Sequence, residues 1–332
     1  MKQGNEQDRG KENQDPQIKK IKIGVSACLM GQNVRYNGGH TRDPYLIQTL
    51  GRFMDYVPVC PETECGMPVP REAMRLTGDP ENPSLTTIKT KKDMTAQMKA
   101  WAEKRLDGLE KEDLCGFIFK SKSPSSGLFR VRVYNDKGMP SMNGTGIWAG
   151  MFVKRFPLLP AEEEGRLHDP VLRENFIERV FVFKRWRELI QEGKTPGGLV
   201  DFHTRHKMLF LAHSPQVYRE MGKLVAAPRK DDMDAWFDDY ARLLTRAMLL
   251  KSTVAKNVNV LQHMMGYFKK ELSADEKQEL LEVLENYKKR RTPLIAPITL
   301  VKHYARKYRE PYLGAQVYLN PHPVELGLRN HV

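Results

Sequence analysis

The chain has 332 residues, of which 40% are hydrophobic and 29% charged, and its formal net charge is +13. This length and composition are typical of a globular protein with two medium domains, and no apolar run reaches the roughly 18 residues of a membrane span. The basic charge favours a polyanionic partner, but it does not by itself distinguish nucleic acid from other partners.

The N-terminal segment is polar and contains no apolar stretch that would form a signal peptide. We therefore expect residues 1–19 to be a disordered tail and the protein to be cytoplasmic. In a reducing compartment, the four cysteines are expected to serve as metal ligands or reactive thiols rather than as disulfides.

The first two predicted strands both lead into cysteines. A strand over residues 21–26 runs into Cys28, and a helix is expected over residues 44–54. A second strand then ends on Cys60, in the stretch VPVCPETEC. Each cysteine thus follows the carboxyl end of a strand.

The next elements continue the alternation of helix and strand. An amphipathic helix is predicted over residues 92–109, and a strand over residues 116–120 leads into the loop SKSPSSG. The segment LFRVRVYN then alternates apolar and basic residues, as a half-buried strand does. This alternation predicts a parallel α/β sheet over residues 20–160, with ligands bound beyond the carboxyl ends of its strands.

Long helical patterns dominate the second half of the chain and predict a mostly α-helical domain over residues 165–332. Ser273 and Glu276 have the spacing of a capping box at the start of one helix. From residue 171 onward there are 28 Lys plus Arg and 19 Asp plus Glu, so this domain carries most of the basic excess.

A basic cluster with interleaved tyrosines is the predicted RNA-binding surface of the helical domain. Phosphate contacts and stacking on an unpaired base suit this combination, although a solvated helix face is the alternative. The predicted contacts are Lys288, Lys289, Arg290, Arg291, Lys302, Arg306, Lys307 and Arg309, and the tyrosines are Tyr304, Tyr308 and Tyr312.

Three cysteines, Cys28, Cys60 and Cys65, can converge at the carboxyl edge of the predicted sheet. Cys115 starts its strand, at the opposite edge, and is expected to be a buried apolar residue. A zinc site would need a fourth ligand such as His40, and no paired C-x-x-C spacing supports one. An iron-sulfur cluster on three thiolates would leave one iron free to act as a Lewis acid.

Three separated segments, SACLMGQNVRYNGG, VCPE and KSKSPSSG, resemble the motifs of the thiouracil desulfidase (TudS) family over about residues 20–155. The helical remainder resembles a domain of formerly unknown function that is fused to this family in tRNA 4-thiouridine desulfidases. The resemblance implies a 4Fe-4S cluster on three cysteines, and replacement of the substrate sulfur by a water oxygen without net redox change.

The resemblance implies that Cys28 and Cys60 are two of the three cluster ligands. The family's third cysteine lies in the pattern Ser-Pro-Ser-Cys-Gly, where this chain has Ser126. We predict that Cys65, five residues from Cys60, takes that place. Ligation by a Ser126 alkoxide and loss of the cluster are the alternatives.

By the same resemblance, Glu62 is the catalytic acid that activates water, and Ser123 hydrogen-bonds the reacting base. Arg35 is predicted to contact a substrate phosphate. The predicted function is desulfuration of thiolated uracil, with 4-thiouridine in tRNA as the substrate. The alternatives are action on free thiouracil, and an RNA-binding protein whose degenerate metal site supports no turnover.

Overall fold

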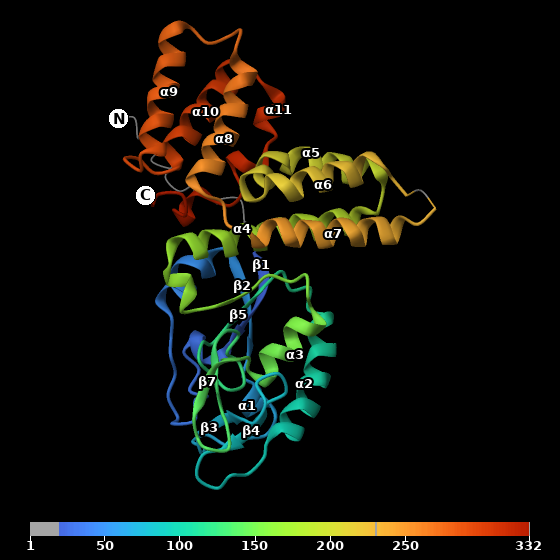
Figure 1. Ribbon diagram of the computed structural model, residues 1–332, viewed down its shortest axis with the longest axis vertical. Coiled ribbons are helices and arrows are strands. Elements are labelled where there is room, and N and C mark those ends of the chain that lie inside the picture. Colours follow the sequence, from blue (N-terminus) through green and yellow to red (C-terminus); the bar gives the residue numbers. More distant parts are fainter. Residues whose placement is uncertain (1–19, 230, 332) are drawn as a thin grey trace, which may run out of the picture.

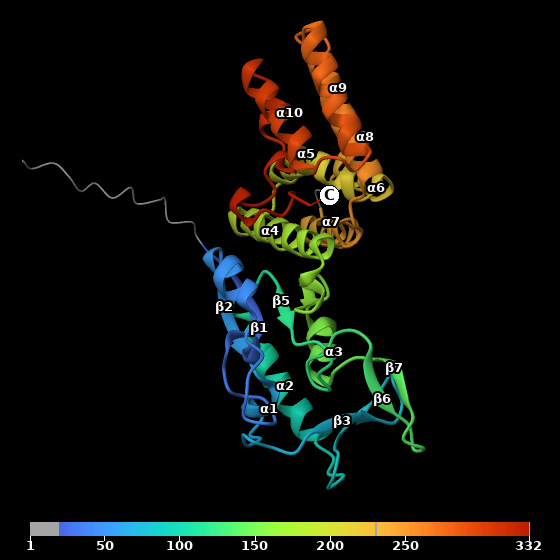
Figure 2. The same ribbon diagram turned by 90° about the vertical axis from the view of Figure 1, so that its left-hand side faces the viewer.

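The computed structural model describes residues 20–229 and 231–331. An α/β region and a helical region are stacked along the long axis of the molecule (Figures 1 and 2). The predicted fold class, an α/β domain followed by a mostly helical one, is confirmed. The predicted disordered tail, residues 1–19, lies outside the described residues.

The α/β region is built on a parallel sheet with the strand order β2, β1, β5, β8. The strands are β1 (Ile21–Ser26), β2 (Met54–Val59), β5 (Phe117–Phe119) and β8 (Ala161–Glu163). β8 extends the sheet past residue 160, where the sequence predicts the domain to end. Gly24 packs so closely on β5 that a Cβ atom there would lie 2.2 Å from the Phe117 ring, so a larger residue would separate the two strands.

A second sheet, which the sequence did not predict, has the order β4, β3, β6, β7. Its strands are β3 (Met74–Thr77), β4 (Ser84–Thr87), β6 (Val131–Tyr134) and β7 (Pro140–Gly144). The alternating segment LFRVRVYN forms β6, which pairs in parallel with β3 and antiparallel with β7. The alternation predicted the strand correctly, but it contained no information about which sheet the strand joins.

Helices cover both faces of the parallel sheet. On one face, α2 (Thr95–Glu110) and α3 (Ile147–Arg155) close an apolar cluster in which the rings of Phe117 and Phe152 lie 4.7 Å apart. On the other face, the helix predicted over residues 44–54 is instead a π-helical turn, Tyr45–Thr49, followed by a 3-10 turn, Leu50–Arg52. The predicted span also runs one residue too far, because β2 begins at Met54.

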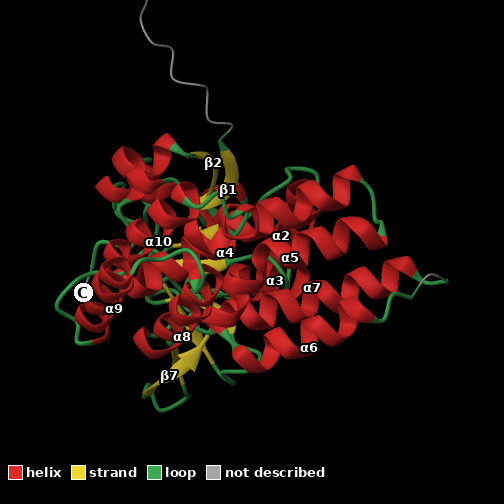
Figure 3. Ribbon diagram, turned by 90° about the horizontal axis from the view of Figure 1, so that it is seen from above, coloured by secondary structure: helices red, strands yellow, loops and turns green. Residues whose placement is uncertain are grey.

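The helical region begins with a 23-residue helix and continues with shorter ones. The helices are α4 (Pro170–Glu192), α5 (Pro196–His213), α6 (Pro215–Ala226), α7 (Met233–Leu249), α8 (Val254–Met265), α9 (Ala274–Lys288), α10 (Ile295–Lys307) and α11 (Pro311–Gly314). Figures 1 and 3 show α5, α6 and α7 lying side by side. The predicted capping box at Ser273 and Glu276 is present at the start of α9. In the part of the chain that the structure describes, no helix is long and apolar enough to cross a membrane.

α4 joins the two regions. Phe176, Ile177 and Val180 pack into the apolar cluster below β1, so this helix is part of the α/β core as well as the helical core. The C-terminal segment is fastened to α4 through Arg329, whose guanidinium is 3.3 Å from Glu174 and 2.8 Å from Glu178. The helical region therefore sits at the amino end of β1, away from its carboxyl end (Figure 1).

Candidate functional site

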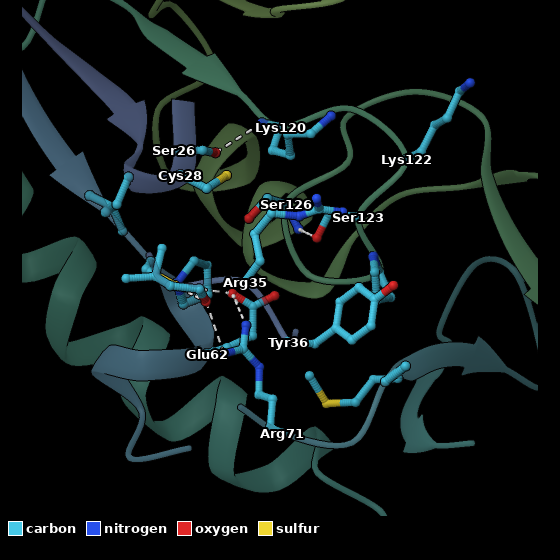
Figure 4. Close-up of a pocket in the computed structure, with 18 of the residues that line it drawn as sticks. Ser26, Cys28, Arg35, Tyr36, Glu62, Arg71, Lys120, Lys122, Ser123 and Ser126 are labelled. Atoms are coloured by element: carbon cyan, nitrogen blue, oxygen red, sulfur yellow. Dashed lines mark hydrogen bonds and ion pairs between the residues drawn. The ribbon is translucent and has the colours of Figure 1, made fainter. Parts of the chain in front are cut away.

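A cavity of about 440 Å³ lies at the carboxyl ends of β1, β2 and β5. Figure 4 shows Cys28, Ser126 and Glu62 around this hollow. The structure brings together five of the predicted site residues, which are Cys28, Arg35, Cys60, Glu62 and Ser123. It also places residues 71–74, which lead into β3, in the wall, so the second sheet borders the cavity.

The two cysteines in the cavity wall are buried at the ends of neighbouring strands. Cys28 follows β1 in a 3-10 turn, and Cys60 is the N-cap residue of α1 (Pro61–Glu64). Burial raises the pKa of the Cys28 thiol, and burial together with the charge of Glu62 raises the pKa of Cys60 to about 11. A cationic metal centre between them would offset this effect, because it stabilises thiolates.

The structure does not bring Cys65 to the cavity with the other predicted ligands. Its thiol donates to the backbone carbonyl of Glu62 at 3.3 Å, and it packs against the apolar cluster that contains Met67. Ser126 instead lies in the cavity wall and is 2% exposed. Its backbone N–H donates to Ser123 Oγ at 3.2 Å, which fixes the loop at this position.

The structure also shows the positions of His40 and Cys115. His40, the fourth ligand that a zinc site would need, is exposed, and its Nδ1 accepts from the backbone N–H of Arg42. Cys115 is 1% exposed and its backbone N–H donates to Lys22 O, at the amino end of β5. The prediction of a buried Cys115 away from the site is confirmed.

The carboxylate of Glu62 is held by three neighbours. Ser125 Oγ donates to Oε1, while Cys60 Sγ donates to Oε2 at 3.4 Å. Arg71 Nη2 lies 3.7 Å from Oε2, and Arg71 Nη1 donates to Val34 O at 2.9 Å. A carboxylate held in this way, with one edge on a cavity, is suited to exchange a proton with a bound water molecule.

Ser125 connects Glu62 to the predicted catalytic serine. Ser123 Oγ and Ser125 Oγ lie 2.9 Å apart, and Ser123 Oγ also accepts from the backbone N–H of Ser125 at 3.3 Å. A Cβ atom at Gly127 would lie 2.7 Å from the Ser123 carbonyl oxygen, so this loop closes tightly on itself.

Ser125 and Arg71 were not among the residues predicted from the sequence. Ser125 lies in SPSSG between Ser123 and Ser126, and this position was the available signal. Arg71 contacts a carbonyl 37 residues earlier in the chain, and no local pattern indicates such a contact.

Three basic side chains at the mouth of the cavity differ in their exposure and in whether they form an ion pair. Arg35 lines it with its guanidinium 5.7 Å from the ring centroid of Tyr36, which is 46% exposed. Lys120 is paired with Glu164 and is therefore part of the wall structure. Lys122 is exposed and extends away from the hollow in Figure 4.

The residues predicted to bind RNA lie on α9, α10 and the turns after them, at the opposite end of the molecule from the cavity (Figure 1). Lys288 and Lys289 pair with Glu285, and Lys307 pairs with Glu276. Lys302 Nζ donates to Asn320. The other four predicted RNA contacts are exposed arginines, namely Arg290, Arg291, Arg306 and Arg309. Tyr304 is 2% exposed and donates to Glu279, so its ring is not available for stacking.

Comparison with known proteins identifies both regions. Residues 23–164 match the family described as 2-thiouracil desulfurase, and residues 207–323 match a family described as a protein of unknown function, DUF1722. A curated relative, the uncharacterized protein YbgA of Escherichia coli (strain K12), is 31% identical over 153 residues, which are 46% of this chain and 90% of that protein. The N-terminal region is therefore a domain of the 2-thiouracil desulfurase family, and the C-terminal region is a DUF1722 domain.

The predicted family is thereby confirmed, and with it the assignment of the protein as an enzyme of the desulfurase class. A solved structure of a [4Fe-4S]-dependent thiouracil desulfidase, TudS, is 30% identical and covers 45% of this chain and 95% of that chain, with a TM-score of 0.37. The cavity lies within the residues that match the desulfurase family.

Proposed function

We propose that this desulfurase removes sulfur from 4-thiouridine in tRNA. The reaction exchanges the C=S sulfur for a water oxygen and releases hydrogen sulfide, so bonds to sulfur break while no electrons are gained or lost. The observation that carries the proposal is the position of Glu62, whose carboxylate touches Cys60 and Ser125 in the wall of one cavity.

The donor set at the cavity fits a 4Fe-4S cluster at two positions, because Cys28 and Cys60 offer soft thiolates there. For the third position, the geometry favours the Ser126 hydroxyl over Cys65, since Ser126 lies in the cavity wall and Cys65 is packed away from it. When bound, such a cluster supplies a Lewis-acidic iron for the substrate sulfur.

The chain's own residues provide the proton chemistry and the orientation. Glu62 takes a proton from the attacking water, while Ser125 and Arg71 keep its two oxygens in place. Ser123 presents a hydroxyl to the uracil ring, and the chain from Ser123 through Ser125 to Glu62 offers a path for a proton. Arg35, which lines the cavity, meets a phosphate of the substrate.

The RNA is contacted by the helical region as well. The members of the predicted cluster that can contact phosphates are the exposed arginines on α10 and next to α9 and α10, namely Arg290, Arg291, Arg306 and Arg309. Their distance from the cavity in Figure 1 means that they would hold a part of the tRNA remote from the reacting nucleotide.

The hydroxyl of Ser126 at the third position favours one alternative function, an RNA-binding protein with a degenerate metal site. Anaerobic reconstitution distinguishes the two. We expect a brown protein with bound iron and sulfide that converts 4-thiouridine in tRNA, and that labels the uridine with oxygen-18 from labelled water. A protein that binds iron and tRNA but releases no sulfide would support the alternative.

Two variants test the third ligand. Cys65→Ser should keep its iron, because Cys65 lies outside the cavity wall. Ser126→Cys should retain iron for longer in air, because a third thiolate replaces an oxygen donor. Loss of iron in Cys65→Ser would assign the third position to Cys65.

A further inference from the structure

The second sheet has one buried and one open face. Its buried side is formed by apolar residues that are no more than 3% exposed, namely Leu76, Leu85, Val131 and Val133. Because side chains alternate along a strand, the residues between them point to the other side. We call this more accessible side the open sheet face. It consists of Arg132, which is exposed, and of Arg75, Thr77, Thr86 and Tyr134, which are half-buried.

The segments that build this sheet are strongly basic. Residues 74–92 and 129–144 contain seven basic and three acidic residues, the acidic ones being Asp79, Glu81 and Asp136. The basic residues are Arg75, Lys89, Lys91, Lys92, Arg130, Arg132 and Lys137. Within the described part of the chain, no carboxylate forms an ion pair with any of these seven.

The open sheet face also offers groups on which bases can stack. The Arg75 guanidinium lies 4.8 Å from the ring centroid of Tyr134. Beside it, in and next to β7, Met139 is 65% exposed and Met142 is 53% exposed. Cations combined with aromatic side chains are typical of surfaces that bind single-stranded RNA, where phosphates and unstacked bases are contacted together.

The strand that carries part of this face begins at the cavity wall. Residues 71–74 line the cavity and run directly into β3, where Arg75 follows Met74. Met74 packs on the buried side of the sheet, while Ala73, two residues before Arg75, also lines the cavity. Figure 2 shows β6 and β7 projecting beside β3 at the same end of the molecule. A nucleotide whose base enters the cavity would therefore leave its chain neighbours close to β3.

We propose that the open sheet face binds the RNA strand that flanks the thiolated nucleotide. This inference rests on the proposed function, since it assumes that the nucleotide enters the cavity as part of an RNA chain. The sheet supplies local contacts that position the reacting base, whereas the arginines of the helical region hold a remote part of the molecule.

The test uses the full-length protein, reconstituted anaerobically, with a tRNA that contains 4-thiouridine. Arg132→Glu combined with Lys137→Glu reverses one exposed charge on the open sheet face and one in the adjoining turn between β6 and β7, and leaves the buried side of the sheet intact. We expect binding of the tRNA to weaken about tenfold or more at moderate salt, and the slope of log Kd against log salt to fall by about 2. The paired variant with Gln at both positions should show an intermediate effect.

The matched control is Arg219→Glu combined with Lys223→Glu, two exposed charges on α6, and it should bind tRNA as the unaltered protein does. Turnover of free 4-thiouracil should be equal in all of these proteins. Equal tRNA affinity of the sheet variant and the control would overturn the inference. If no form of the protein turns over any thiolated substrate while the sheet variant still loses tRNA affinity, the proposed activity fails and the RNA surface stands.

Discussion

The α/β region and the helical region differ in the surroundings of their buried polar groups. In the α/β region, Cys28, Cys60 and Ser126 are buried but face a cavity, and Glu62 is oriented without being enclosed. In the helical region, the buried carboxylates of Glu174 and Glu178 are paired with the Arg329 guanidinium and face no such cavity. The difference indicates that chemistry belongs to the first region and that the second provides structure and surface.

The closed arrangement is clearest on α4. Glu174, Glu178 and His322 lie close enough together to suggest a metal site, but the Arg329 guanidinium already pairs with both carboxylates. His213 Nε2 contacts the other oxygen of Glu178 at 3.0 Å. Because a buried charge is stable only when it is paired, this network serves to fasten the C-terminal segment to α4.

The comparison is tested most strongly at Glu62. Glu62→Gln should keep its iron and its tRNA affinity but lose about a hundredfold or more in turnover, because the group that takes the proton from water is gone. Steady-state sulfide release measures this loss. Glu110→Gln is the matched control, since Glu110 pairs with Arg155 at the end of α2, outside the cavity wall, and it should stay within a fewfold of the unaltered protein. Equal rates for the two variants would remove Glu62 from the mechanism.

A smaller effect is expected at Ser125. Ser125→Ala removes the hydroxyl that holds Glu62 Oε1, and we expect kcat to fall roughly tenfold while KM is unchanged, because misorientation of a catalytic group affects the reaction more than binding. Ser141→Ala on β7, which removes a hydroxyl that donates to Val133 O, should change neither constant. A rise in KM without a fall in kcat would mean that Ser125 serves substrate binding instead.

The third prediction concerns stability instead of turnover, at a buried histidine in the helical region. His206 is 2% exposed, and burial lowers its pKa to about 3. The ordinary pKa of histidine is about 6.5, so at pH values below 6.5 and above the pKa of the buried His206, the unfolded chain binds a proton that the folded chain excludes. This residue alone should therefore make the free energy of unfolding about 2 kcal/mol lower at pH 5 than at pH 7.

His206→Phe, which keeps a ring among the neighbouring aromatic side chains, should remove that part of the pH dependence. Urea unfolding followed at pH 7 and pH 5 gives the measurement. His303→Gln, at an exposed histidine on α10, should leave the pH dependence as it was. An unaltered pH dependence in His206→Phe would show that the histidine is accessible to protons in the folded state.

Local patterns in the sequence predicted several of the elements. The strand over residues 21–26 forms as predicted, and the capping box at Ser273 and Glu276 is present, because both depend on residues a few positions apart. The cavity residues Cys28 and Cys60 could also be placed together, since carboxyl ends of parallel strands share one edge of a sheet.

Contacts between distant segments were decided by the tertiary structure. Cys65 is close to Cys60 in the chain, yet the turn of α1 directs it to the apolar cluster that contains Met67. Ser126 reaches the cavity from the loop after β5. The basic run at Lys288 and Lys289 is partly neutralised by Glu285. Spacing along a chain limits which residues can meet, but packing, burial and pairing determine which of them do, and these depend on the whole fold.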